Sequence, residues 1–138
     1  MNLAQMIELH EGRRNKLYKC TAGKWTIGVG RNIEDRGLSN PEIDFLRDND
    51  IALSRQELTM KLPWFVGLDP VRQAVLIDMH FNMGWPVLSQ FTNTLEYIRK
   101  GEHEKAASAM LQSKWASQVG NRAKRLAKMM QWGSWPTE

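Results

Sequence analysis

The sequence predicts an α+β fold in which helices predominate. Three observations support this prediction: apolar residues recur every three to four positions over most of the chain, one short segment alternates with a period of two, and prolines and glycines mark the helix ends. The 138 residues show no internal repeat, low-complexity tract or domain linker. We therefore expect one domain, 1–138, that is long enough to bury its own core.

The first expected element is a short amphipathic helix. Asn2 is a suitable N-cap, and Gly12 is suited to end the helix. Helical spacing between them places four side chains on one face: Leu3, Met6, Ile7 and His10. Glu11 then falls at the C-terminal end of the helix.

A β-hairpin is expected after this helix. Leu17, Trp25, Ile27 and Val29 alternate with small or polar residues, and Ala22-Gly23 supplies a turn. Cys20 and Thr26 fall on opposing arms, where two side chains can face one another.

The remaining elements are expected to be helices. Asn40 and Pro41 begin a long helix towards Pro63, whose expected buried positions are Ile43, Leu46, Ile51 and Leu58. Asp69-Pro70 repeats this start signal, and the following helix to Gly84 is apolar on most sides, as expected at the centre of a helical lobe. Trp85-Pro86 is expected to break it, and three shorter helices should follow at about 93–100, 103–112 and 122–132.

Composition limits the class of protein. A single cysteine excludes an intramolecular disulfide, so the fold must be stabilised by packing. The segment 1–14 is amphipathic and charged, so we expect no signal peptide. The sequence has no run of eighteen uncharged apolar residues, so we expect no stable membrane insertion. We expect a monomer.

The net charge of +4 is unevenly distributed. Segments 13–31 and 99–128 are basic, whereas segment 34–50 is acidic. This pattern suits a partner with fixed negative charge, such as a bacterial envelope polymer or a nucleic acid, and charge alone does not choose between them.

Glu11 is a candidate general acid. The negative end of the helix dipole disfavours ionisation of a carboxyl at this position, and a carboxyl that keeps its proton can protonate a leaving group. With Cys20 and Thr26 on the adjacent hairpin, the arrangement suits hydrolysis.

These residues carry a family resemblance. Eight residues separate Glu11 from Cys20, and five separate Cys20 from Thr26. This spacing resembles the catalytic signature of T4-like phage lysozymes, glycoside hydrolase family 24. Further similar segments occur in the family's order over nearly the whole chain: Tyr18-Lys19, Thr26-Ile27-Gly28, the run 79–84, Phe91-Thr92-Asn93, Trp115 and the run 121–125. The departures are Arg31, where T4-type sequences have His, and a shortened stretch at about 33–50.

The resemblance implies a lysozyme-like architecture. It comprises a small β-containing lobe at about 13–50 and a helical lobe made of 1–12 and about 63–138, joined by the long helix. It also implies catalytic roles for Glu11, Cys20 and Thr26, with Arg122 pairing with Glu11. The implied substrate-binding residues are Asn32, Phe81, Asn82 and Thr94, whereas Ala109 replaces a family asparagine that contacts sugar.

Three roles for Cys20 remain open at this stage. As a thiolate it would attack the anomeric carbon, polarise a water, or offset positive charge in the transition state. An ordinary thiol is mostly protonated at neutral pH, and Lys19 and Lys24 are the cations expected to lower its pKa. Thr26 is expected to orient the attacking water.

Metal and cofactor sites are not expected. The three histidines, His10, His80 and His103, lack the spacing of metal ligands. Gly28-Val29-Gly30 lacks the Lys-Ser/Thr continuation of a phosphate-binding loop, so these glycines are expected to form a turn.

The function expected from the resemblance is that of an endolysin: a muramidase that hydrolyses the β-1,4 bond between N-acetylmuramic acid and N-acetylglucosamine in peptidoglycan. The alternatives are a lytic transglycosylase, a non-catalytic wall-binding protein, and a basic nucleic-acid-binding domain. The last leaves Glu11 and the hairpin unexplained, so we expect no nucleic-acid partner. An endolysin would be made in the cytoplasm of the host bacterium and reach the wall by holin-type release or external delivery.

Overall fold

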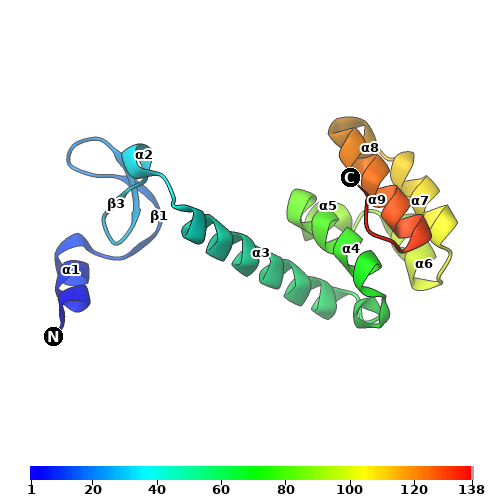
Figure 1. Ribbon diagram of the computed structural model, residues 1–138, viewed down its shortest axis with the longest axis horizontal. Coiled ribbons are helices and arrows are strands. Elements are labelled where there is room, and N and C mark those ends of the chain that lie inside the picture. Colours follow the sequence, from blue (N-terminus) through cyan, green and yellow to red (C-terminus); the bar gives the residue numbers. More distant parts are fainter. Residues whose placement is uncertain (138) are drawn as a thin grey trace. The chain divides into compact units, whose positions relative to one another are not determined.

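The computed structural model describes residues 1–137, which divide into two units, 1–47 and 48–137. A helix and a small antiparallel sheet come first and helices follow, which confirms the predicted α+β class (Figure 1). Within the described residues, no helix is both long enough and apolar enough to cross a bilayer.

The first unit begins with α1 (Leu3–Glu11), whose ends are those predicted. The side chains of Asn2 and Gln5 each accept a hydrogen bond from the other's backbone amide at 2.9 Å, which forms a capping box. Gly12, at φ +82°, ends the helix and donates its N–H to the Glu8 carbonyl at 2.8 Å. Glu11 is thereby fixed as the last helical residue.

The predicted hairpin is confirmed and has a third strand. Strands β1 (Arg14–Lys19), β2 (Trp25–Gly28) and β3 (Arg31–Asn32) form an antiparallel sheet in that order. Thr26 on the central strand pairs with Tyr18 on one side and Asn32 on the other. A four-residue helix, α2 (Ile33–Arg36), follows directly and was not predicted.

The long helix α3 (Asn40–Lys61) was predicted with its N-cap one residue too late. Ser39 is the capping residue: its Oγ accepts from the Glu42 amide at 3.3 Å, and its own amide donates to Glu42 Oε1 at 2.7 Å. Ile43 and Leu46, expected to be buried, are exposed, whereas Leu58 is fully buried. Burial is confined to the second half because only that half contributes to the core of the second unit.

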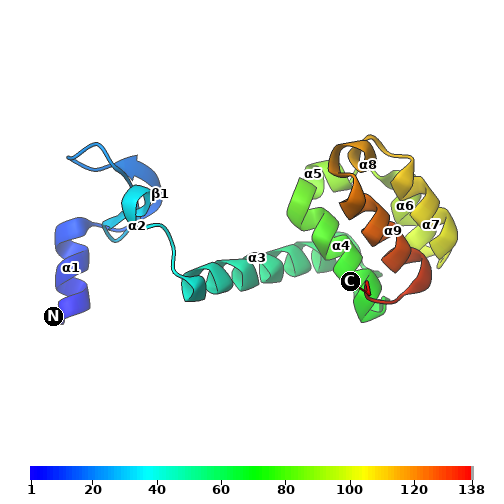
Figure 2. The same cartoon turned by 45° about the horizontal axis from the view of Figure 1, so that its top comes forward.

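The second unit is a helical lobe. After a 3₁₀ turn at Phe65–Gly67 come α4 (Pro70–Met83), α5 (Trp85–Leu88), α6 (Thr92–Arg99), α7 (His103–Leu111), α8 (Lys114–Val119) and α9 (Asn121–Trp132). In both views α9 lies beside α7 (Figures 1 and 2). Asp69 caps α4 as predicted, and Val75, Leu76 and Met79 of that helix are fully buried.

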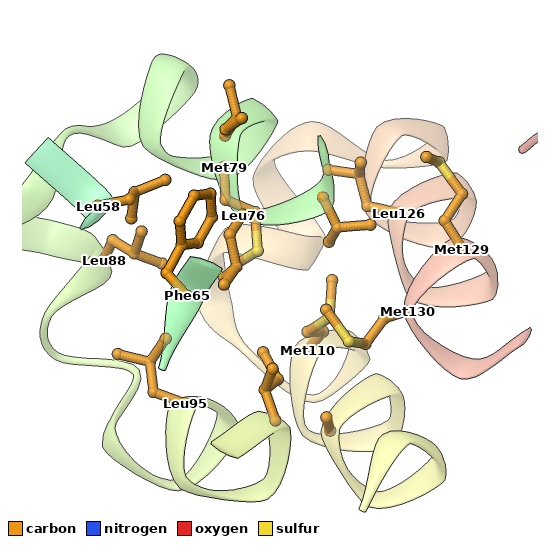
Figure 3. Packing of buried hydrophobic residues seen from close by; sticks show 14 of the residues in the cluster. Leu58, Phe65, Leu76, Met79, Leu88, Leu95, Met110, Leu126, Met129 and Met130 are labelled. Atoms are coloured by element: carbon orange, nitrogen blue, oxygen red, sulfur yellow. The ribbon is translucent and has the colours of Figure 1, made fainter. Parts of the chain in front are cut away.

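The core of this unit is formed where α4 meets its neighbours. Leucine, phenylalanine and methionine side chains from several helices converge there, among them Leu58, Phe65, Leu76, Leu88, Met110 and Met130 (Figure 3). Tight packing of this core holds the helices of the second unit in fixed positions, and with them the exposed side chains that those helices carry.

Two predictions about the helices were wrong or incomplete. Trp85-Pro86 was expected to break the helix, but Gly84 ends α4 and Trp85 begins the next helix, α5. Pro86 lies in the first turn of α5, where a backbone N–H has no helical partner to lose. Helix α8, capped by Ser113, was not predicted. Residues 1–12 fall in the first unit, and their expected docking on the helical lobe stays a prediction.

Candidate active site

Glu11 lies against the turn between β2 and β3. A Cβ atom placed on Gly30 would stand 2.4 Å from Glu11 Oε2 and 2.8 Å from its Cδ, so the carboxyl packs directly on the glycine. Gly30 also has φ +65°, a left-handed conformation that other residues rarely adopt. The end of α1 and the sheet therefore meet at the Glu11 carboxyl, which stays exposed.

Thr26 is held rigidly in the central strand. Its side chain is buried, and Oγ1 donates a hydrogen bond to the Lys24 carbonyl at 2.9 Å. Because the hydroxyl hydrogen is used there, the oxygen lone pairs remain available to accept from a neighbour.

Cys20 was predicted to lie on a strand opposite Thr26, but it lies in the turn that joins β1 and β2, and Tyr18 is the β1 residue opposite Thr26. Its backbone N–H donates to the Lys24 carbonyl at 3.0 Å, and its carbonyl accepts from the Gly23 N–H at 2.8 Å. The backbone amides of Lys24 and Ala22, in that order, lower the pKa of the Cys20 thiol, while partial desolvation opposes them. The turn therefore makes ionisation of this thiol easier than in an ordinary cysteine.

The expected source of this pKa shift was wrong. Lys19 and Lys24 were predicted to favour the thiolate, but both are directed elsewhere. The Lys24 ammonium lies 3.5 Å from both Glu34 and Asp35, which raise its pKa, Asp35 having the larger effect. The Lys19 ammonium lies over the Trp25 ring, 5.0 Å from its centroid.

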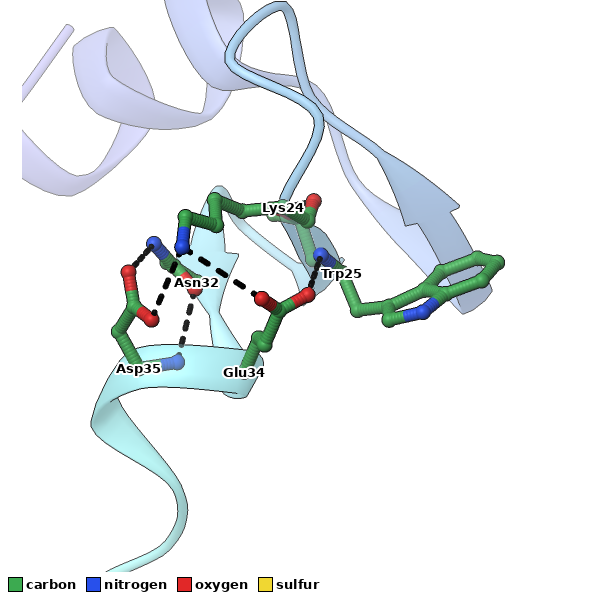
Figure 4. A network of polar contacts seen from close by, with 6 residues as sticks. Lys24, Trp25, Asn32, Glu34 and Asp35 are labelled. Carbon is green, nitrogen blue, oxygen red and sulfur yellow. Dashed lines mark hydrogen bonds and ion pairs between the residues drawn. The ribbon is translucent and has the colours of Figure 1, made fainter.

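The Lys24 contacts belong to a polar network that fixes α2 on β2 (Figure 4). The Trp25 amide donates to Glu34 at 3.2 Å. Asn32 caps α2: its Oδ1 accepts from the Asp35 amide at 3.0 Å, and its Nδ2 donates to the Asp35 carboxylate at 2.9 Å. The Asn32 amide is thus occupied by a local cap, and its expected contact with saccharide stays a prediction.

A second clamp joins β3 to the start of α3. Arg31 donates to Glu42 Oε1 at 2.7 Å and to the Gly37 carbonyl at 3.2 Å, and it forms a second contact with Glu42 through Nη2. Hydrogen bonds from Arg31, and after them those from Ser39, lower the pKa of Glu42 to about 2. Sequence reasoning noted Arg31 only as a departure from the family pattern and missed its partner.

Two of the expected substrate-binding residues meet in the second unit. Asn82 and Thr94 line a hollow of about 740 Å³, together with Ala109 and Trp115. The Trp115 indole donates to Asn82 Oδ1 at 2.8 Å and packs edge-on against Phe91, with ring centroids 6.2 Å apart. Phe81 is half exposed on α4 and does not line this hollow.

Arg122 contacts a residue that sequence reasoning missed. Its Nε donates to Asp78 Oδ1 at 2.8 Å, and its Nη2 lies 3.4 Å from the Asp78 carbonyl oxygen. The expected pairing of Arg122 with Glu11 would join the two units and stays a prediction. No sequence signal connected Asp78 with Arg122, since 44 positions separate them.

Among residues 1–137, no three His, Cys, Asp or Glu side chains gather as a metal-binding group. Within the first unit, the structure joins Cys20 to Thr26 through the β1–β2 turn and places Glu11 on the next turn of the same sheet. An acid, a thiol that favours ionisation and a fixed hydroxyl can together protonate a leaving group and direct a water.

Comparison with known proteins agrees with this chemistry. The sequence model of a family described as Phage lysozyme matches residues 8–131. A probable T4-type lysozyme of Dictyostelium discoideum is 26% identical, with 96% of this chain and 95% of that protein covered. An endolysin of Acyrthosiphon pisum secondary endosymbiont phage 1 is 30% identical over 80% of this chain and 75% of its own length. The pre-baseplate central spike protein of Enterobacteria phage T4 is 26% identical over 97% of this chain and 28% of that protein.

Proposed function

The chain belongs to the phage lysozyme family, and we propose that it is a muramidase that hydrolyses the β-1,4 bond between N-acetylmuramic acid and N-acetylglucosamine in peptidoglycan. The observation that carries this proposal is the contact of the Glu11 carboxyl with Gly30, on the sheet that also holds Cys20 and Thr26. The names of the similar proteins, lysozyme and endolysin, support a cell-wall hydrolase.

Glu11 acts as the general acid in this proposal. It gives its proton to the glycosidic oxygen as the bond to the anomeric carbon breaks, and the sugar takes on oxocarbenium character. Its exposed position on the Gly30 turn leaves the carboxyl open to a polymeric substrate.

Cys20 supplies negative charge next to the developing cation. The amides of Lys24 and Ala22 favour its thiolate, which offsets the positive charge of the transition state or polarises a water. We favour this electrostatic role over nucleophilic attack because Thr26, fixed by its bond to the Lys24 carbonyl, has lone pairs that accept a hydrogen bond from a water. That water adds to the anomeric carbon and leaves its proton with the thiolate or the solvent.

The hollow of the second unit is proposed to hold saccharide. The Asn82 amide is oriented by the Trp115 indole, and Thr94 brings a hydroxyl to the same wall. Hydroxyl and amide groups beside an aromatic wall are suited to pyranose rings. Ala109 replaces the asparagine of the family pattern and has no polar group. The hollow therefore offers one hydrogen-bonding side chain fewer to a bound sugar.

The test is digestion of purified peptidoglycan, followed by mass analysis of the released muropeptides. Hydrolysis adds one water to every bond cleaved, and we expect reducing N-acetylmuramic acid ends. Products that are one water lighter, with anhydro ends, would identify a lytic transglycosylase instead. Intact peptidoglycan after incubation with folded protein would refute any cleavage function.

A further inference from the structure

A second hollow in the helical unit is lined by none of the residues given a catalytic or saccharide-binding role in the proposed function. It has a volume of about 610 Å³ and is formed by one face of α9 and by residues 134–137, which follow it. Its lining combines basic side chains, two tryptophans and several small polar groups: Asn121, Lys124, Arg125, Lys128, Trp132 and Trp135, with Ser134 and Thr137 at the end.

The helical period of α9 produces this face. Ala123, Leu126, Ala127 and Met130 point into the core, so the opposite face carries the polar residues at 121, 124, 125 and 128 together with Trp132. Gly133 ends the helix in a left-handed conformation. Arg72 fixes this end by donating to the Met130 carbonyl at 2.7 Å and to the Gln131 carbonyl at 3.0 Å.

The charge of the hollow has one sign. Between positions 105 and 137 the sequence contains six Lys or Arg residues and no Asp or Glu. No acidic residue lines the hollow within the described chain. The ammonium groups of Lys124 and Lys128, one helical turn apart, repel one another, and a bound polyanion removes that repulsion.

The two tryptophans distinguish this face from an ordinary solubilising surface. Trp132 is 71% exposed and Trp135 is 60% exposed. Large indoles left in water beside lysines are typical of surfaces that bind a ligand, because stacking recovers the apolar area that folding leaves unburied.

We propose that this hollow binds a glycan strand that bears phosphate groups. Lys124 and Lys128 are one helical turn apart and face successive anionic groups, while the indoles of Trp132 and Trp135 stack on sugar rings. Asn121, Ser134 and Thr137 offer hydrogen bonds to sugar hydroxyls. A concave site lined by such groups suits a single strand better than the flat surface of a bilayer.

The choice of a wall glycan over other polyanions rests on the proposed function. Teichoic acid and the phosphorylated core of lipopolysaccharide share the required chemistry of sugar and phosphate. In either case the hollow would hold the enzyme on the envelope while cleavage takes place elsewhere on the chain.

Calorimetric titration of the full-length protein tests the proposal, with four probes in separate arms: glycosylated teichoic acid, lipopolysaccharide, a single-stranded oligonucleotide and phosphatidylglycerol vesicles. The variant K124Q/K128Q should lose roughly tenfold in affinity for a glycan at low salt, because two exposed charge contacts are removed. The matched control K61Q/K100Q, exposed lysines of the same unit, should bind like the unmodified protein. W135A should weaken binding without changing its salt dependence, because stacking involves no charge.

Binding of either glycan that is weakened by K124Q/K128Q and unchanged in the control would support the proposal, and the arm with the higher affinity identifies the source. Equal affinity in both double variants, or tighter binding of the oligonucleotide or the vesicles than of both glycans, would overturn it. Melting curves verify that every variant is folded. Digestion of teichoic-acid-free peptidoglycan is measured separately, so that failure of the proposed cleavage is distinguishable from failure of this site.

Discussion

Gly30 is the residue on which the position of Glu11 depends most directly. Replacing it with alanine brings a Cβ to 2.4 Å from Oε2 and also strains a backbone at φ +65°. We predict that Gly30→Ala displaces the Glu11 carboxyl and sharply reduces peptidoglycan cleavage. The backbone strain alone costs about 1–2 kcal/mol.

Gly37→Ala is the matched control for this prediction. Gly37 has φ +62°, but nothing lies within 4 Å of an added Cβ. It should therefore lose similar stability in thermal melts and keep its cleavage rate. If both variants lose activity in proportion to their stability, the contact between Gly30 and Glu11 has no catalytic importance.

The environment of Cys20 leads to a second prediction at this scale. Since the turn amides lower the pKa of the thiol, the thiolate should appear, by its ultraviolet absorbance, at lower pH than in an unfolded control. Cleavage should rise over the same pH range. Cys20→Asp should retain much of the activity because it restores a negative charge, whereas Cys20→Ser should lose most of it.

The substitution that decides the role of Cys20 is Cys20→Ala, which removes both charge and basicity. We expect it to be as impaired as Cys20→Ser. Full activity of Cys20→Ala would exclude this side chain from the mechanism.

At the scale of elements, the Arg31–Glu42 clamp predicts acid sensitivity of the first unit. The pKa of Glu42 is about 2 in the folded chain, below the roughly 4.3 of an unfolded glutamate. Its contribution to stability is therefore complete above pH ~4.3 and is lost as pH falls towards 2. Glu42→Gln should be less stable at neutral pH and should lose less stability between pH 4 and pH 2.

Hydrogen exchange of the backbone amides of the first unit, at several denaturant concentrations and pH values, measures this effect. Glu34→Gln is a suitable control, because it also removes a carboxylate from the first unit but leaves the clamp intact. Parallel pH profiles for Glu42→Gln and the unmodified protein would show that the clamp does not contribute to acid sensitivity.

His80 joins α3 to α4 through two hydrogen bonds. Its Nε2 lies 2.6 Å from Glu57 Oε1, and its Nδ1 lies 2.8 Å from the Ser54 hydroxyl oxygen. His80→Leu leaves the buried Ser54 hydroxyl without this partner and should cost about 1–3 kcal/mol.

A double-mutant cycle with Ser54→Ala measures that coupling. Removing Ser54 as well should recover part of the loss, since no hydroxyl is then left unsatisfied. Additive effects of the two substitutions on the unfolding free energy would show that the contact between Ser54 and His80 is energetically unimportant.

Element limits set by local contacts were predictable from the sequence. Asn2, Gly12, Asp69 and Gly84 act on backbone groups a few residues away, so their sequence positions are sufficient. The cap at Ser39 was also accessible: Ser39 and Glu42 have the spacing of a capping box, and only the adjacent Asn40-Pro41 suggested a later start.

Contacts between distant elements were not predictable in the same way. The spacing of Glu11, Cys20 and Thr26 located the candidate site, but the orientation of Lys24 depends on Glu34 and Asp35 in a helix that was not predicted. The packing of Glu11 on Gly30 and the pairing of Asp78 with Arg122 likewise arise only from tertiary structure.

At the scale of the whole molecule, the proposed functions are divided between the two units. The first unit holds the acid at the end of α1, the thiol in the β1–β2 turn and the hydroxyl on the central strand of the sheet. The second holds the hollow proposed for saccharide and, separately, the basic hollow of α9. Chemistry and polymer binding can therefore be altered independently by substitution.

The most direct test of this account is the rate at which reducing ends are released from peptidoglycan by Glu11→Gln, with Glu8→Gln as its control. Both substitutions remove a carboxylate from α1, but the Glu8 carboxylate pairs with the exposed Arg13 side chain at 3.0 Å. General acid catalysis predicts that Glu11→Gln melts normally and loses roughly 10²–10⁴-fold in rate, while Glu8→Gln stays active. A folded Glu11→Gln protein that cleaves at the rate of the Glu8→Gln control would contradict the assignment of Glu11 as the catalytic acid.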